Sequence, residues 1–261
     1  MGSAMEAARR KAAARQNDPK LAARDAKIGR VTDRAMAVAS YFVMVFVGIV
    51  IAKYAIWVFG GISITIGVIA TILAEIVVIL MALYITKKNT QWRSYLMLGN
   101  FKWRNMLIGA GTGIGLYALN IAASLVMALS GVKVFSSETS TALTALGGFE
   151  RFAILMIVVP FVVPFIEEVF FRGMVLNLVA RSFDEAKRRR GAVWGIAVSS
   201  LLFIFAHLQG FETASDWFVI GSIAMTGTVS GILAWRTQSV FTSYAAHLAY
   251  NLTTVIMASL R

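Results

Sequence analysis

The sequence predicts an all-α fold, a polytopic bundle of transmembrane helices. Of its 261 residues, 58% are hydrophobic and only 15% are charged, and the mean hydropathy is +0.73. A chain with so few polar side chains does not have the composition of an ordinary soluble domain. Apolar windows of about 20 residues, the length that crosses a bilayer, recur along it. We therefore expect a multi-pass integral membrane protein that contacts the lipid bilayer.

Residues 1–34 are expected to form a polar cytosolic arm. They alternate Ala with Lys and Arg and carry Asp18-Pro19 near the middle, which is typical of a partly helical or disordered segment. The first apolar window after the arm has membrane length and no cleavage signal, so we expect it to be retained. Residues 35–261 are then the transmembrane helical domain.

Seven windows define the expected spans. The third, with Gly109, Gly111, Gly113 and Gly115, is typical of a helix that lets a neighbouring backbone approach closely. The fourth is too long for one upright crossing and contains Pro160 and Pro164. It predicts a kinked helix, or a half-helix feeding a second one, which would add an eighth span. The windows are 35–58, 62–86, 106–130, 152–180, 191–209, 217–235 and 239–259.

The distribution of basic residues predicts the orientation. The arm carries nine Lys and Arg residues, and the loops at 87–104 and 181–190 carry five each. The loops at 59–61, 131–150 and 208–216 together carry a single basic residue, Lys133. Lys and Arg collect on the cytoplasmic side, so we expect the N-terminus in the cytosol and the protein in the cell membrane. Because the charge of +12 lies in short segments between apolar runs, it does not predict a nucleic-acid partner.

Three charges interrupt the fourth window. Glu167, Glu168 and Arg172 lie between Phe165 and Val175 in an otherwise apolar run. An ionisable group at that depth costs at least about 2.5–3.5 kcal/mol, so a functional role is the default hypothesis. The chain has no Cys, which excludes disulfides, thiolate metal sites and cysteine-protease chemistry. It has only two His.

Three pairs of side chains share the helical i,i+4 spacing, which places both members on one helix face. They are Glu168 with Arg172, Phe203 with His207, and His247 with Asn251. Glu168 and Arg172 have the favourable order for an intrahelical ion pair. Glu167 points about 100° away around the helix and has no local counter-charge, so it is the carboxylate free to act as a general base.

Together these groups supply the parts of amide hydrolysis. Glu167 would take a proton from water, and His207 would hold that water or protonate the leaving amine. His247 and Asn251 could donate hydrogen bonds to the oxyanion. Two imidazoles and a carboxylate are also ligands that zinc accepts. If a metal binds, Glu167, His207 and His247 would hold it.

The order Glu167-Glu168-x-x-x-Arg172, Phe203-x-x-x-His207 and His247-x-x-x-Asn251 resembles the three signature motifs of the CPBP/Abi family of intramembrane proteases. That family includes the Rce1-type endopeptidases, which remove the last three residues of prenylated CAAX proteins. The resemblance covers roughly residues 150–259, and all three motifs match without a substitution. The first 150 residues show nothing specific to the family.

This resemblance implies a helical membrane core with a site below the membrane surface. It implies that Glu167 is the base acting with His207, that His247 and Asn251 form the oxyanion hole, and that Glu168, Arg172 and Phe203 support the site. The family is often labelled metalloprotease, although Rce1-type members resemble glutamate-dependent enzymes without a bound metal. The substrate would be a prenylated C-terminal tail or another membrane-bound peptide precursor.

Two other functions compete with this hypothesis. Intramembrane Glu, Arg and His can form the relay of a proton-coupled transporter, but the sequence lacks the paired broken helices in matching halves that many transporters have. A catalytically idle family member could act as a scaffold or immunity protein, and the intact motifs argue against it. The chain has no H-E-x-x-H or G-x-S-x-G motif and no Asp in an expected span.

Overall fold

The computed structural model describes residues 96–132, 153–183, 187–207 and 213–259, with isolated positions at 73, 76, 77, 80 and 148. All of them lie in one compact unit, Met44–Arg261. These residues form helices, and this part of the chain contains no strand, which confirms the all-α class. The basic arm, the first window and nearly all of the second fall outside the described residues.

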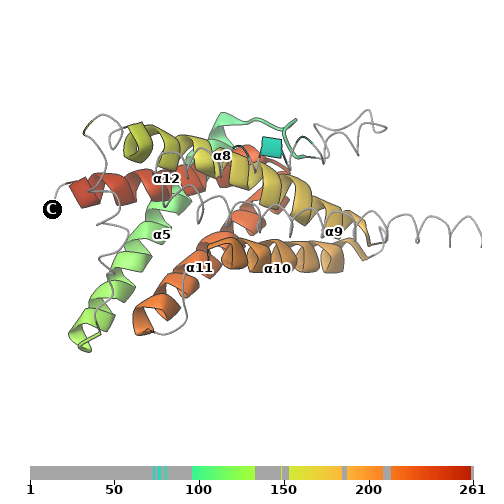
Figure 1. Ribbon diagram of the computed structural model, residues 1–261. Coiled ribbons are helices and arrows are strands. Elements are labelled where there is room, and N and C mark those ends of the chain that lie inside the picture. The colour runs from blue at the N-terminus through green and yellow to red at the C-terminus, as the bar shows by residue number, and fades with distance from the viewer. Residues whose placement is uncertain are drawn as a thin grey trace, which may run out of the picture. The chain divides into compact units, whose positions relative to one another are not determined.

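Five helical segments build the described region (Figure 1). Helix α5 packs along α12, and α10 packs against both α11 and the segment that ends in α9. The segments are α5 (Trp103–Leu129), the run from η1 (Ile154–Val162) through α8 (Val163–Glu168) and η2 (Val169–Leu176) to α9 (Asn177–Arg181), α10 (Arg188–His207), α11 (Ala214–Thr237) and α12 (Val240–Ser259).

Helix α5 has the surface of a lipid-facing helix. Its buried positions are mostly small, as at Gly109, Gly113 and Ser124. Its large apolar side chains point outward, and Leu125 and Leu129 are 59% and 89% exposed. Exposing so much apolar surface to water is unfavourable, whereas lipid tails are as apolar as Leu and can cover it. In lipid, helices contact one another mainly through small residues, which let their backbones approach closely. This pattern supports the expected membrane span.

Three described helices are long and apolar enough to cross a membrane. They are Trp103–Leu129, Arg188–His207 and Ala214–Thr237, which correspond to the expected windows at 106–130, 191–209 and 217–235. Helix α12 follows the window at 239–259 but carries His247, Asn251 and several hydroxyl side chains. The chain is an integral membrane protein, and the count of seven or eight spans stays a prediction.

The fourth window forms a single helical run that alternates between π and α geometry. Two π-helical stretches, η1 and η2, flank the short α8 that carries Glu167 and Glu168. Pro160 lies inside η1, where its missing N–H and its ring disfavour ordinary α-helical bonding. The capping residues Val163, Val169 and Asn177 all keep right-handed helical dihedrals. The chain therefore continues as a helix through these residues, and π turns of this kind are frequent at functional sites.

Two glycines bring α5 against the backbone of α12. A Cβ atom on Gly109 would fall well inside van der Waals contact with the carbonyl oxygen of Thr242, and one on Gly113 would do the same with Ala246. Gly111 and Gly115 face open space. The expected close approach is thus confirmed at Gly109 and Gly113, which are four residues apart on one face. Ala246 precedes His247, so this contact also fixes the position of a site histidine.

Gly113→Ala is expected to lower both stability and activity. The added methyl must push away the α12 backbone at Ala246, and overpacking of this kind costs about 1–3 kcal/mol. The melting temperature of the detergent-solubilised protein measures the effect. Gly111→Ala is the matched control, because nothing lies within 4 Å of its new methyl. Equal melting temperatures for the two variants would show that α5 does not pack as described.

Helix α11 begins at a capping box and ends at a residue with left-handed backbone dihedrals, and α12 starts shortly after it. Thr213 and Asp216 form a capping box, with Asp216 N donating to Thr213 Oγ1 at 3.1 Å and Thr213 N donating to Asp216 Oδ2 at 2.8 Å. The helix stops at Gln238, whose φ of 50° is left-handed. Val240 N then donates to Met97 O at 3.1 Å, which ties the first turn of α12 to the segment before α5.

Candidate active site

Glu167 faces both histidines of the chain. Its Oε1 lies 3.3 Å from His207 Nε2, and its Oε2 lies 3.8 Å from His247 Nε2. The side chain of Glu167 is only 8% exposed, against 32% for His207. Residues from α8, the last turn of α10 and the middle of α12 thus meet at one carboxylate. The sequence predicted no local counter-charge for Glu167, and its two partners come from distant helices.

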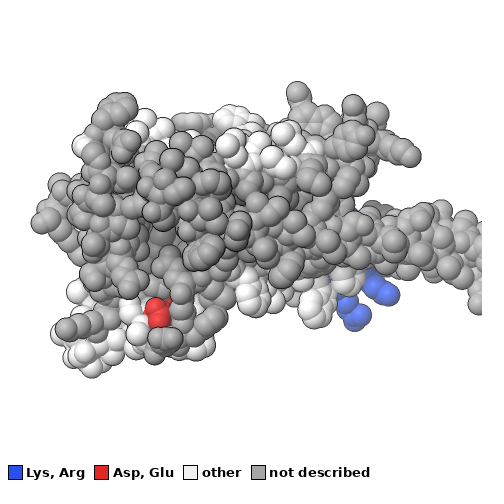
Figure 2. Space-filling model, in the orientation of Figure 1, with Lys and Arg blue, Asp and Glu red and all other residues white. Residues whose placement is uncertain are grey.

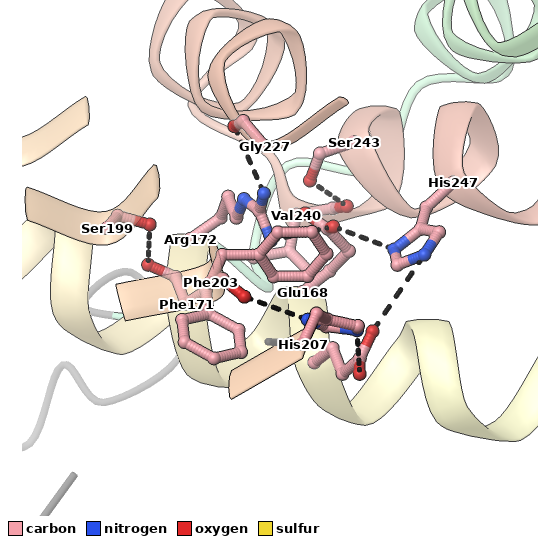
Figure 3. Close-up of polar contacts among 11 residues, drawn as sticks. Glu168, Phe171, Arg172, Ser199, Phe203, His207, Gly227, Val240, Ser243 and His247 are labelled. Atoms are coloured by element: carbon pink, nitrogen blue, oxygen red, sulfur yellow. Dashed lines mark hydrogen bonds and ion pairs between the residues drawn. The ribbon is translucent and has the colours of Figure 1, made fainter. Parts of the chain in front are cut away.

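Each imidazole is oriented by its other nitrogen (Figure 3). His207 Nδ1 lies 2.8 Å from the carbonyl oxygen of Phe203, which can only accept, so Nδ1 is the donor. His207 is the last residue of α10, and its ring bonds back to a carbonyl one turn earlier in the same helix. This bond fixes the ring and presents Nε2 to Glu167.

His247 is oriented by Glu168. Its Nδ1 lies 3.1 Å from Glu168 Oε1, and both side chains are buried. With Nδ1 donating to this carboxylate, His247 Nε2 carries a hydrogen only when the ring is doubly protonated. The same count applies to His207. A hydrogen bond between either ring and Glu167 therefore needs one further proton, held on the ring, which then donates, or on the carboxyl group, which then donates to Nε2.

Glu168 and Arg172 form the ion pair expected from their spacing. Arg172 Nη1 lies 3.0 Å from Glu168 Oε1, and both side chains are 0% exposed. Arg172 Nη2 also donates to Gly227 O on α11 at 3.0 Å. Glu168 Oε1 is therefore shared between Arg172 and His247. Two buried carboxylates face one guanidinium, so one protonated imidazole makes the cluster neutral, and a neutral cluster avoids the cost of burying net charge.

Phe203 packs at the centre of these groups. It is 2% exposed, and its ring centroid lies 4.4 Å from the ring of His207 and 5.8 Å from the ring of His247. The guanidinium of Arg172 lies 4.4 Å from the same centroid, within cation–π range. Phe203 thus holds His207 twice, through its carbonyl and through its ring. Its expected supporting role agrees with this packing and stays a prediction.

A cavity of about 440 Å³ opens onto the site. Glu167, His207, His247 and Asn251, the four residues expected to carry catalysis, all line it. Glu168 and Arg172 lie behind this wall and are absent from its lining. The surrounding wall is mainly apolar, formed by Val163, Phe203, Phe218, Val219 and Ile223.

The arrangement does not support the alternative zinc site. Glu167 presents a different oxygen to each histidine. Within the residues that the structure describes, no group of three or more His, Asp or Glu side chains is arranged to hold a metal ion. The metalloprotease label is therefore unsupported.

Comparison with known proteins assigns the family. Residues 149–253 match the type II CAAX prenyl endopeptidase Rce1-like family. This part of the chain is similar to that family. No curated protein and no solved structure matches the chain. The matched range contains all three motifs, so the resemblance seen in the sequence is confirmed, and the match supports a protease of the CAAX endopeptidase class at the level of the family.

The candidate site includes polar residues that the motifs do not contain. Asn120 on α5, Ser222 on α11 and Tyr250 on α12 also line the cavity, and Asn120 lies outside the matched range. A lone amide in the middle of an apolar helix was a signal in the sequence that could have identified Asn120. Ser222 and Tyr250 gave no such signal, because hydroxyl side chains are common in the neighbouring helices.

Proposed function

We propose that this protein is an intramembrane endopeptidase that hydrolyses a peptide bond with a water molecule activated by Glu167. One observation carries the proposal: the carboxylate, both imidazoles and the Asn251 amide line the same cavity in a helical membrane domain. The family match supports the reaction class. A scaffold protein would not need a buried base beside two oriented imidazoles, since each such group costs desolvation energy.

The first step forms the nucleophile. A water molecule that enters the cavity beside Glu167 and His207 gives a proton to the Glu167 carboxylate, and the resulting hydroxide attacks the carbonyl carbon of the scissile bond. The fixed 3.3 Å approach of Glu167 and His207 places two groups able to exchange that proton at the point of attack. General-base assistance of this kind contributes about 10²–10⁴-fold to the rate.

The second step stabilises and then collapses the oxyanion. His247 Nε2 donates to it when the ring is doubly protonated, and the Asn251 side-chain amide supplies a second donor from the next turn of α12. The proton taken from water passes from Glu167 or His207 to the leaving nitrogen, and the C–N bond breaks. A carboxylic acid and an amine leave, and Glu167 returns to its starting form.

The substrate class follows from the surroundings of the site. A cavity with a mainly apolar wall inside a lipid-facing bundle fits a peptide that is held at the membrane, such as a prenylated C-terminal tail or another membrane-bound precursor. The purified protein is expected to cleave a farnesylated peptide ending in a CAAX sequence, with the released tripeptide measured by mass spectrometry. The same peptide without the farnesyl group is the control. Failure to cleave either peptide would count against the proposal.

We also propose that the basic end of the described helices faces the cytosol. Arg188, Arg189 and Arg190 are exposed at the start of α10, and the guanidinium of Arg188 lies 5.8 Å from the ring of Trp235 near the end of α11. Figure 2 shows the Lys and Arg atoms gathered beside the start of α10, away from the acidic atoms beside the start of α11. The positive-inside rule places such an end in the cytosol.

The N-terminal arm is expected on the same side, because its nine basic residues would otherwise have to cross the membrane. A cysteine introduced at Ala13 should react with a membrane-impermeant thiol reagent only after the cells are opened. The chain has no native Cys, so labelling reports this position alone. Labelling of intact cells from outside would reverse the proposed topology.

A further inference from the structure

Three polar side chains outside the catalytic motifs form a hydrogen-bonded chain in the cavity wall. Asn120 Nδ2 donates to Tyr250 Oη at 2.6 Å, and Tyr250 Oη lies 3.0 Å from Ser222 Oγ. The three residues come from α5, α12 and α11, and all of them line the cavity. None belongs to the three motifs, and none has a part in the hydrolysis steps above.

Counting hydrogens shows that this chain has a donor to spare. The Asn120 amide can only donate through Nδ2, so Tyr250 Oη accepts that bond. The two hydroxyl groups then hold two hydrogens but share one contact, in which either can be the donor. One hydroxyl hydrogen, on Ser222 or on Tyr250, is therefore not used within the chain. Successive hydrogen bonds polarise one another, which strengthens a donor at the end of such a chain.

The electrostatics of the cavity select the kind of group that this donor would bind. The residues that line the cavity include no Lys or Arg, and both of its histidines already face the Glu167 carboxylate, so a second carboxylate placed here would lie near Glu167 without a cation of its own. A neutral acceptor carries no such penalty. The apolar side chains of Phe218, Val219 and Ile223 border Ser222 along α11. A peptide carbonyl with an apolar side chain beside it matches both features.

Tyr250 is also placed next to the reacting groups. It directly precedes Asn251 and follows His247 by three residues on α12. The three residues therefore lie within about one turn of the same helix. Its ring packs edge-on against Tyr117 of α5 with centroids 6.0 Å apart, which fixes the direction of the hydroxyl. A peptide bound at Tyr250 and Ser222 would be held a short distance from the oxyanion donors.

We propose that Asn120, Tyr250 and Ser222 form a substrate subsite that donates a hydrogen bond to a backbone carbonyl other than the scissile one. The proposal rests on the peptidase function proposed above. It makes α5, which lies outside the family match, part of the substrate-binding wall. Tyr250 and Ser222 act in binding, and Asn120 is a positioning residue that orients the Tyr250 hydroxyl.

The test compares variants that lose one hydroxyl each. Tyr250→Phe and Ser222→Ala are expected to raise KM for the farnesylated CAAX peptide about three- to tenfold, the loss of one hydrogen bond, with little change in kcat. Tyr117→Phe is the matched control. This variant also removes a phenolic hydroxyl group, from the ring that packs against Tyr250. Tyr117 does not line the cavity. Ser222→Ala keeps the Asn120–Tyr250 bond, so it separates binding from helix packing.

A set of altered substrates identifies the acceptor. Each non-scissile carbonyl of the peptide is replaced in turn by a thiocarbonyl, which accepts hydrogen bonds more weakly. At one position the wild-type protein should lose affinity, while Tyr250→Phe and Ser222→Ala should be indifferent to the change. A structural role would not produce this pattern. Peptide affinity is also measured directly by fluorescence anisotropy, so the test does not depend on turnover.

The outcomes separate the two proposals. Cleavage with unchanged KM and affinity in both hydroxyl variants would overturn the subsite and leave the peptidase function standing. Equal losses in Tyr117→Phe and Tyr250→Phe would also overturn it, since the effect would then come from packing. Binding of the peptide without cleavage, with affinity lost in both hydroxyl variants, would support the subsite and overturn the peptidase function.

Discussion

Replacing Glu167 by Gln should lower peptide cleavage by about 10²–10⁴-fold, the usual contribution of a general base. The amide keeps the shape of the side chain and most of its hydrogen-bonding capacity, but it cannot take a proton from water. The buried contacts of Glu167 with His207 and His247 should adapt to it without unfolding. The measurement is kcat for the farnesylated peptide, together with the melting temperature of the same preparation.

The neighbouring carboxylate provides the matched control. Glu168→Gln is the same chemical change one residue away, but Glu168 is paired with Arg172 and His247 behind the cavity wall. It should lower the melting temperature, whereas Glu167→Gln should leave it nearly unchanged. If Glu167→Gln cleaves the peptide at close to the wild-type rate, the proposed mechanism is wrong.

His207 should act with Glu167 as one unit. His207→Ala is expected to be about as severe as Glu167→Gln, and the double variant should be little worse than either single variant, since residues that act together in one step are strongly non-additive. Multiplied effects would assign the two residues to separate steps. Loss of wild-type activity on chelation, restored by zinc, would instead turn Glu167, His207 and His247 into metal ligands.

The sequence predicted most of the site because its motifs use local geometry. The i,i+4 spacing alone predicted the Glu168–Arg172 pair, and the 100° offset predicted that Glu167 would face a different direction. The windows at 106–130, 191–209, 217–235 and 239–259 became helices close to their expected bounds. The window at 152–180 became a continuous helical run. These features depend on neighbours within one helix, so the order of residues is enough to infer them.

The remaining features depend on how helices pack. Nothing local to Glu168 predicts that it orients His247 from another helix at 3.1 Å. The π turns on both sides of α8 were not expected either, since Pro160 predicted a kink or a break, and a widened turn is a third way to accommodate it. The role of α5 in the cavity wall was missed for the same reason, because Asn120 meets Tyr250 only after α5 and α12 have packed.

Arg172→Ala is the second change with a large expected effect, here on stability. It leaves the Glu168 carboxylate buried and without its guanidinium, and breaking one side of a buried pair costs about 3–5 kcal/mol. It also removes the hydrogen bond to Gly227 O and the cation–π contact with Phe203. The melting temperature in detergent should fall sharply. Activity should fall as well, because Glu168 would hold His247 less firmly.

Arg181→Ala is the matched control for this prediction. Arg181 ends the same helical run, is exposed, and donates from Nε to Asn177 Oδ1 at 2.9 Å. Substitutions at exposed positions usually change stability by no more than about 0.5 kcal/mol, so this variant should melt close to the wild type. A similar loss in both variants would point to a general intolerance of the helix to Ala, and not to the buried pair.

A double variant separates the charge from the packing of Arg172. Glu168→Gln combined with Arg172→Ala removes the orphaned carboxylate, so it should melt above Arg172→Ala alone even though it carries one more substitution. Together with the effect of Glu168→Gln alone, that recovery gives the coupling energy of a double-mutant cycle. It should not restore cleavage, because His247 Nδ1 would then face a neutral amide. If Arg172→Ala were inactive at an unchanged melting temperature, Arg172 would act directly on the substrate and not through Glu168.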